Sequence, residues 1–216
     1  MSTSVSSPLR SPLALAIINS TIAGNTATGD DFIAGALIES QPSIGAYAMT
    51  LTNTTVSSNS ATTTNASATL VAGGALIGIH TSGSLTLRNS ILSANSATIA
   101  GNASLAPDAR IKAGVFGAAS SLLGSALSGT NSGNGNVFTD APGLGPLANN
   151  GGATRTMALL TGSGAIDAGS NASAVNAASQ PLQTDQTGFS RIRNGIVDIG
   201  AFEFPGDHIF GDGFEL

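Results

Sequence analysis

Acidic residues are scarce in the first half of the sequence, and two of them stand side by side. Asp30 and Asp31 are adjacent, and Glu39 is the only other carboxylate among residues 1–97. Glycoside hydrolysis needs two carboxyl groups about 5 to 9.5 Å apart across a sugar, and Ca²⁺ is bound through clustered carboxylate oxygens. Asp30 and Asp31 are therefore the candidate metal ligands, with Ca²⁺ as the metal. The interpretation that we favour over a catalytic or calcium role is a solvated turn in a loop, so we predict no metal site and keep Asp30 and Asp31 as weak candidates.

The remaining side chains that could do chemistry do not form a catalytic set. His80 ends an expected strand, where a structural or exposed histidine is the simpler interpretation. Serine is abundant, but no Gly-x-Ser-x-Gly motif is placed on a strand-to-helix turn. The glycine-rich runs 132–136 and 162–164 lack the following lysine of a phosphate loop. The chain has no cysteine for thiolate metal sites or disulfides. We predict no catalytic residue and no cofactor beyond the candidate Ca²⁺.

Composition excludes two classes of partner. Only 9% of the 216 residues are charged, against about 25% in ordinary globular proteins, while 41% are hydrophobic and periodic. The net charge is -5 and the seven basic residues are scattered, so no basic stripe exists to bind nucleic acid. The longest apolar stretch, at 68–79, is too short to span a bilayer, which takes about 20 residues. Residues 1–11 lack a signal peptide, and because a repeat starts almost at once, we expect a fragment of a longer chain.

The elements that must position these groups come from one pattern that occurs three times, at residues 14–27, 48–61 and 84–97. Each copy begins with alternating apolar and small or polar residues, which is typical of a strand with one buried face. A second kind of strand, at 34–39 and 73–80, precedes the later copies, and residues 109–129 carry a degenerate fourth copy. Two rows of asparagine mark corresponding positions in the copies: Asn19, Asn53 and Asn89, and six residues later Asn25, Asn59 and Asn95.

This repeat favours a stacked all-β fold. Helical repeats would show apolar residues three and four apart, and hairpins would need Asn-Gly or Asp-Gly turns; the copies have neither. The predicted fold is a right-handed single-stranded parallel β-helix (a solenoid) with three strands per coil, over residues 1–130. The alternation places the first asparagine row inward, so we expect Asn19, Asn53 and Asn89 to be structural and to bond one another as a ladder.

The last third of the chain has a different composition. Nine of the twelve acidic residues and seven of the eight phenylalanines lie from residue 108 onward. We predict a C-terminal cap over residues 131–204 and a short tail over 205–216, because the end repeats of a stacked fold need atypical covers. Our hypothesis is that charged residues pair over the last coil and, with Phe189, Phe202 and Phe204, plug the end of the core. These structural residues are Asp167, Asp185, Arg191, Asp198 and Glu203.

Four motifs carry a resemblance to a known family. They are Gly-Leu-Gly-Pro-Leu-Ala-Asn-Asn-Gly-Gly at 143–152, Gly-Ala-Ile-Asp-Ala-Gly at 164–169, Thr-Asp-Gln-Thr-Gly-Phe-Ser-Arg at 184–191 and Val-Asp-Ile-Gly-Ala-Phe-Glu at 197–203. They resemble the choice-of-anchor Q domain of bacterial surface β-helix proteins, whose fold is related to that of pectate lyases. Ala153 stands where that family usually has proline. The upstream repeats are similar to those of polymorphic outer-membrane proteins, and the tail resembles a C-terminal motif of exported bacterial proteins.

The resemblance implies location and architecture more than chemistry, since a fold does not determine a function. We expect a bacterial, secreted or cell-surface β-helix protein without catalytic activity, which serves in adhesion or contacts glycans or proteins through its loops. The alternative is a carbohydrate-active β-helix, a polysaccharide lyase or glycoside hydrolase, whose catalytic coils are missing or unrecognised. Asp30 and Asp31 are the weak metal candidates in either case.

Overall fold

The computed structural model of the chain describes residues 13–38, 47–77, 83–103, 106–112, 114–124, 127–128 and 131–206. Glu39, His80 and residues 207–216 lie outside these described residues. The expectations for His80 and for the tail motif therefore stay predictions.

The long strands of the repeats lie side by side in one parallel sheet, which we call sheet A. Leu15 lies opposite Met49, and Met49 lies opposite Leu85, so the predicted copies stack in the predicted alignment. The inward residues Met49 and Leu85 are buried, as the alternation predicts. In sheet order, the strands are β1 (Leu13–Ile18), β6 (Tyr47–Thr52), β11 (Gly83–Arg88), β16 (Val115–Ala119) and β19 (Asn131–Ser132).

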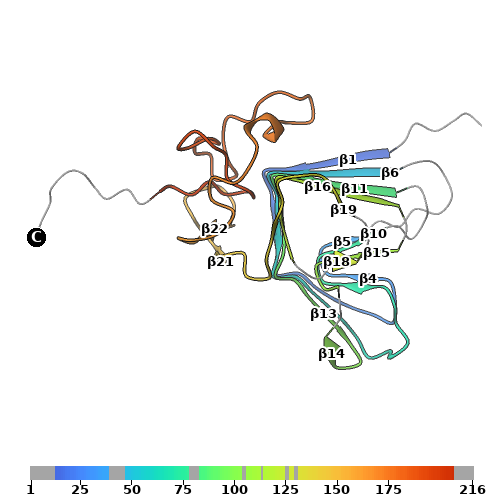
Figure 1. Ribbon diagram of the computed structural model, residues 1–216. Helices are drawn as coiled ribbons and strands as arrows, with labels where there is room; N and C mark the ends of the chain where they lie inside the picture. Colours follow the sequence, from blue (N-terminus) through green and yellow to red (C-terminus); the bar gives the residue numbers. More distant parts are fainter. Residues whose placement is uncertain are drawn as a thin grey trace, which may run out of the picture.

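Two further parallel sheets follow the same order of repeats. Sheet B contains β2 (Thr21–Ala23), β7 (Thr55–Ser57), β12 (Ile91–Leu92), β17 (Leu122–Leu123) and β20 (Val137–Phe138). Sheet E contains β5 (Leu37–Ile38), β10 (Ala75–Ile77), β15 (Ala109–Ile111) and β18 (Leu127–Ser128). The main core is enclosed by sheets A, B and E (Figure 1), because its buried residues come from these three sheets. Sheet A contributes Met49, Leu51, Leu85, Leu87, Phe116 and Ala118. Sheet B contributes Val56, Leu92 and Leu123, and sheet E contributes Leu37, Ala75 and Ala109.

The first three repeats carry additional strands between sheets B and E. Sheet C contains β3 (Thr26–Thr28), β8 (Ser60–Thr63) and β13 (Ser96–Ile99), with β14 (Asn102–Ala103) antiparallel at its edge. Sheet D contains β4 (Ile33–Ala34) and β9 (Val71–Ala72). Ala61, Ala97 and Val71 form a small second core between them. In the fourth repeat the described strands belong to sheets A, B and E alone.

The C-terminal segment, residues 142–206, lies against the outside of sheet B (Figure 1). It contains the antiparallel pair β21 (Leu144–Ala148) and β22 (Thr156–Leu159) and the 3₁₀ turn η1 (Asn171–Ser173). Ile91 and Leu122 point out of sheet B and pack against Ile199 and Phe202 of this segment. The segment therefore buries the outer face of the third and fourth repeats.

The structure is all-β with parallel sheets, which confirms the predicted class at that level. In the part of the chain that is described, no helix is long and apolar enough to cross a membrane.

Candidate functional site

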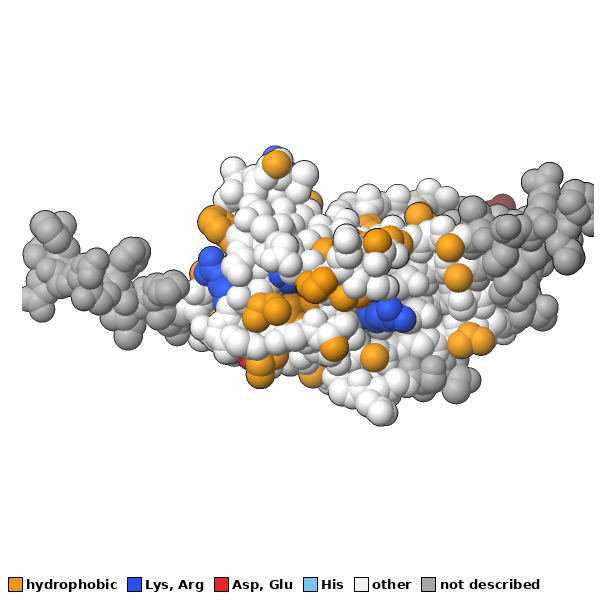
Figure 2. Space-filling model, turned by 90° about the horizontal axis from the view of Figure 1, so that it is seen from above, with side chains coloured by type: hydrophobic (Ala, Val, Ile, Leu, Met, Phe, Trp, Pro, Cys, Tyr) orange, Lys and Arg blue, Asp and Glu red, His pale blue; other side chains and the backbone are white. Residues whose placement is uncertain are grey.

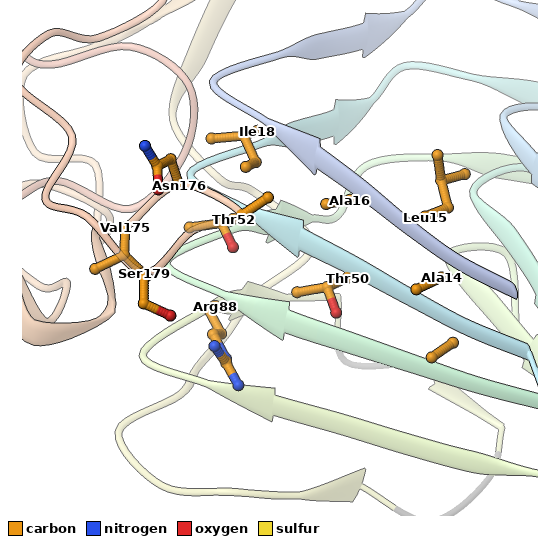
Figure 3. A pocket seen from close by; sticks show the side chains of 12 residues that line it. Ala14, Leu15, Ala16, Ile18, Thr50, Thr52, Arg88, Val175, Asn176 and Ser179 are labelled. Carbon is orange, nitrogen blue, oxygen red and sulfur yellow. The ribbon is translucent and has the colours of Figure 1, made fainter. Parts of the chain in front are cut away.

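A groove lies on the outer face of sheet A, where the C-terminal segment overhangs it (Figures 2 and 3). Its volume is about 330 Å³. Small outward side chains of the first three repeats form the floor, and residues 175–179 form the wall. The lining residues are Ala14, Leu15, Ala16, Ile18, Ala48, Thr50, Thr52, Arg88, Val175, Asn176, Ala177 and Ser179. This combination of a flat floor and one wall can accommodate an extended molecule lying across the strands.

The floor follows from the register of the strands. Ile18, Thr52 and Arg88 form one row across β1, β6 and β11, at the carboxyl ends of these strands. Ala16 and Thr50 belong to the next outward row, because side chains on one face are two residues apart. The floor carries the longer side chains Leu15 and Ile18 on β1 and Arg88 on β11, whereas β6 between them presents Ala48, Thr50 and Thr52. A ligand can therefore approach the sheet most closely over β6.

The wall is held in place by the first asparagine row. Ser170 donates its N–H to Asn89 Oδ1 at 2.8 Å and accepts from Asn89 Nδ2 at 2.9 Å. Asn171 accepts from Val197 N at 2.8 Å and donates to Gly195 O at 2.8 Å, which fixes η1. Asn176 Oδ1 then accepts from two backbone N–H groups across a tight turn. The loop at 175–179 is therefore anchored to the end of β11, next to Arg88.

Arg88 is the single charged residue among those that line the groove. Its side chain is exposed and lies beside Thr50, Thr52 and Ser179 (Figure 3). The groove can therefore offer one cation and the hydroxyl groups of Thr50 and Ser179 to a ligand. Thr52 is buried, and the amide of Asn176 is bonded within its own loop.

The candidate metal ligands Asp30 and Asp31 do not form a metal centre with other residues. Asp31 Oδ1 accepts backbone N–H groups of Phe32, Thr69 and Leu70 at 3.0 to 3.2 Å. Partial burial opposes ionisation, but these hydrogen bonds and Lys112 lower the pKa of Asp31 overall. No group of three metal-ligating side chains occurs among the described residues. Asp31 joins the loops of two successive repeats.

The expected ladder at the first asparagine row is wrong. Asn19, Asn53 and Asn89 each adopt φ 47°, at the bend between sheets A and B, and asparagine tolerates this left-handed backbone better than most residues. The bend turns their amides outward: they donate to Thr184 O at 2.6 Å, Asp198 O at 3.4 Å and Ser170 O at 2.9 Å, respectively. The row binds the C-terminal segment to three successive repeats.

The ladder forms instead at the second asparagine row. Asn25 Nδ2 donates to Asn59 Oδ1, and Asn59 Nδ2 donates to Asn95 Oδ1, each at 2.9 Å. Asn95 Nδ2 donates to Asp108 Oδ1 at 2.8 Å, so a carboxylate ends the row in place of a fourth amide. The left-handed residues of this turn are the preceding ones, Gly24, Ser58 and Ala94.

The predicted charged residues of the C-terminal segment come together, but they do not plug the end of the core. Arg191 is fully buried and donates to Glu203 Oε2 through Nε at 3.0 Å, to Gly200 O at 3.1 Å and to Asn19 Oδ1 at 3.3 Å. The cluster thus reaches the first repeat from the side. The plug hypothesis fails because the segment packs along sheet B, across the repeats, and not over the last one. Phe202 is buried there, while Phe189 is 51% exposed and lies under Arg193.

The carboxylates of this cluster hold backbone N–H groups. Asp185 accepts from Thr187 N at 2.8 Å and Glu203 N at 2.9 Å, and Asp198 accepts from Asp167 N at 2.7 Å and Phe204 N at 2.6 Å. The side chain of Asp167 is exposed, so its contribution is its backbone N–H. These residues fold the loops of the segment.

Three buried carboxyl groups have raised pKa values. Burial raises the pKa of Glu203 to about 7, against the lowering effect of the Arg191 charge. Burial also raises the pKa of Asp108 to about 6, against two hydrogen bonds from Asn95. The pKa of Asp198 is raised by burial, although the N–H groups of Asp167 and Phe204 oppose it. All three sit in structural positions, away from the groove.

The residues that line the groove were missed by sequence reasoning. The outward positions of the strands carry no motif, and the loop at 175–179 lies far from them in the sequence. One signal was available: Ile91 and Leu122 are apolar where β2 and β7 have Thr21 and Thr55 in the same register. That change predicts an outer face covered by another part of the chain.

The sequence matches no protein-family model, and the comparisons with curated proteins and with solved structures give no match.

Proposed function

We propose that this chain is a non-catalytic, secreted or cell-surface β-helix protein that contacts glycans in the groove between sheet A and residues 175–179. The observation that carries the proposal is the composition of the groove: a floor of Ala and Thr with Leu15 and Ile18, a wall with Asn176 and Ser179, and one arginine. Sugar rings present hydroxyl groups at their edges and C–H groups on their faces. Short hydroxyl-bearing and apolar side chains can contact both.

The positions of the carboxylates support a binding role. A glycosidase places two carboxyl groups across the scissile bond, whereas the residues that line this groove include none. The described carboxylates with raised pKa values, Asp108, Asp198 and Glu203, accept hydrogen bonds from Asn95, from backbone N–H groups and from Arg191. Each has a structural task that a proton-transfer role would disturb.

The finer architecture is part of the same proposal. A right-handed helix with three strands per coil is supported by the enclosure of the main core by sheets A, B and E. Sheets C and D would then be an insertion between the second and third strand of a coil. Right-handedness is the general rule for connections between parallel strands. The four motifs of the C-terminal segment support membership of the choice-of-anchor Q group, and with it a bacterial surface location.

The test is a panel of soluble and insoluble polysaccharides, scored for binding and for new reducing ends or unsaturated products. We expect retention of the protein on at least one polysaccharide with no product. Ala16→Trp, which fills the floor, should abolish retention. Thr28→Trp, at an exposed position of β3 outside the groove, is the matched control and should retain it. Turnover of any polysaccharide would establish the carbohydrate-active alternative instead.

A further inference from the structure

Arg88 has no partner within the described part of the chain: its guanidinium makes no hydrogen bond, ion pair or ring contact there. Four of the other described cations are engaged, whereas the exposed side chain of Arg155 lies outside the groove. Arg191 pairs with Glu203, Arg193 and Lys112 lie over phenylalanine rings at 5.5 and 5.4 Å, and Arg110 donates to Thr69 O. Arg88 is also held at a defined place, because its strand is paired on both sides, with β6 and β16.

The chemistry of Arg88 selects an anion. A guanidinium presents five N–H donors in a planar fork and binds carboxylate or sulfate groups with two parallel hydrogen bonds. No lining residue of the groove carries a negative charge that would compete. The rest of the groove is neutral, so a ligand that fits it carries isolated negative charges among neutral polar groups.

The floor of the groove argues against a peptide as that ligand. Acidic peptides that add to a sheet need a free strand edge for backbone hydrogen bonds. Arg88 and Thr52 lie on β11 and β6, both edges of which pair with neighbouring strands. Among the described strands of the floor, β1 alone has an unpaired edge, and β6 separates it from β11 and Arg88. A ligand over this surface is contacted by side chains, chiefly Arg88 and the hydroxyl groups of Thr50 and Ser179. Such contacts suit a chain of sugar rings.

We propose that the groove selects an acidic glycan, with a carboxylate or sulfate group of the sugar bound by Arg88 and neighbouring rings lying over Thr50 and Thr52. This inference rests on the proposed glycan-binding function and names the class of glycan. Residues 175–179 cover one side of the bound chain, and the ring that carries the charge lies at the carboxyl end of β11.

The experiment measures dissociation constants by calorimetry for four probes: oligomers of a hexuronic acid, a sulfated galactan, a neutral β-glucan and, as the competing ligand, an acidic peptide. The variants are Arg88→Gln, Arg88→Lys and, as a control with the same change in net charge, Arg155→Gln, whose side chain is exposed outside the groove. Arg88→Gln should weaken binding of an acidic probe about fivefold to tenfold. Arg88→Lys should retain part of the affinity, and Arg155→Gln all of it. Added salt should weaken the wild type and leave Arg88→Gln nearly unchanged.

The outcomes separate the two proposals. If the hexuronic acid and the sulfated galactan differ in affinity, the tighter one identifies the anion. Equal binding of the neutral glucan, with no loss in Arg88→Gln, would overturn the acidic specificity and leave glycan binding standing. Binding of none of the glycans would overturn both proposals, as would Arg88-dependent binding of an acidic peptide in their place. Circular dichroism of each variant would establish that a loss of affinity is not a loss of fold.

Discussion

Asn53 and Asn59 lie six residues apart in the same repeat, and each has counterparts one repeat before and one repeat after. Both are buried. The amide of Asn53 points out of the stack, toward the backbone of Asp198. The amide of Asn59 points along the stack and bonds Asn25 and Asn95.

The difference follows from the backbone. Asn53 is itself the left-handed residue of its bend, whereas at the second turn Ser58 takes that conformation and Asn59 follows it. The left-handed residue is thus the asparagine itself at the first bend and the residue before the asparagine at the second turn. This shift of one residue points the amides of the two rows in different directions. The first row joins the C-terminal segment to the repeats, and the second row joins the repeats to one another. Because the segment supplies the wall of the groove, the first row also positions the candidate site.

The largest effect is expected from the buried arginine that completes the first row. Arg191→Met should lower the free energy of unfolding by about 3 to 5 kcal/mol, because it leaves Glu203 buried without its partner. Arg193→Met, at a half-buried position over Phe189, should cost about 1 kcal/mol or less. Urea denaturation of both variants measures the difference, and equal losses would show that Arg191 does not link the segment to the repeats.

Breaking the second row should cost somewhat less. Asn59→Ala removes the donors to Asn95 Oδ1 and Ile22 O and the acceptor for Asn25, so we expect a loss of about 2 to 4 kcal/mol. Asn102, which is exposed and donates only to Ala100 O, provides the control as Asn102→Ala. A neutral Asn59→Ala variant in thermal unfolding would contradict the ladder.

The pH dependence of stability reports on both rows, because each is bonded to a buried carboxyl group. Asp108 accepts from Asn95 of the second row, and Glu203 pairs with Arg191, which bonds Asn19 of the first row. A carboxyl group with a raised pKa keeps its proton in the folded state after the unfolded chain has released it, so it favours the fold at low pH. We therefore expect stability to fall by roughly 1 to 3 kcal/mol as the pH rises from about 4 to about 7, through Asp108 and Glu203. Asp108→Asn keeps an acceptor for Asn95 and should remove the share of Asp108, which lies between about pH 4 and about pH 6. The share of Glu203, which extends to about pH 7, should remain. A wild-type protein that gains stability over this range would contradict the assignment.

The smallest effect concerns the backbone at the bend. At φ 47°, Asn53→Ala keeps the Cβ that disfavours this left-handed backbone and removes the amide that helps asparagine to adopt it. The change should cost about 1 to 2 kcal/mol. Asn53→Gly should cost less, since glycine adopts this conformation freely. The hydrogen bond of Asn53 is long, at 3.4 Å, and its Oδ1 is buried without a partner, so the amide itself contributes little. If Asn53→Gly were as unstable as Asn59→Ala, the amide of Asn53 would matter as much as that of Asn59. That result would contradict the conclusion that Asn53 acts mainly through its backbone conformation.

The periodicity of the sequence was sufficient for the repeats. The pairing of Leu15 with Met49 and of Met49 with Leu85 follows from the spacing of 34 and 36 residues. The same periodicity could not place the C-terminal segment, because its docking depends on which way a bend points the amides of Asn19 and Asn89. That direction is set by one φ angle and leaves no mark in the spacing.

The groove was out of reach for a related reason. Arg88 looks like an ordinary solvated residue at the end of a strand until the loop at 175–179 is known to lie beside it. Close approaches such as that of Gly200, where a Cβ would lie 2.9 Å from Ile91 Cδ1 and Thr55 Oγ1, are also visible only after the segment is docked. The glycines of the segment read in the sequence as turns, and Gly200 serves equally as a contact point.

The first asparagine row holds the C-terminal segment against sheet B, while the second row bonds within the stack, and this division is the central claim. Nuclear Overhauser effects from the side-chain amide protons test it directly. The amide protons of Asn89 should show contacts to Ser170 and none to Asn53, and those of Asn59 should show contacts to Asn95 and Ile22. Contacts between the amides of Asn53 and Asn89, without contacts to Ser170, would contradict the account.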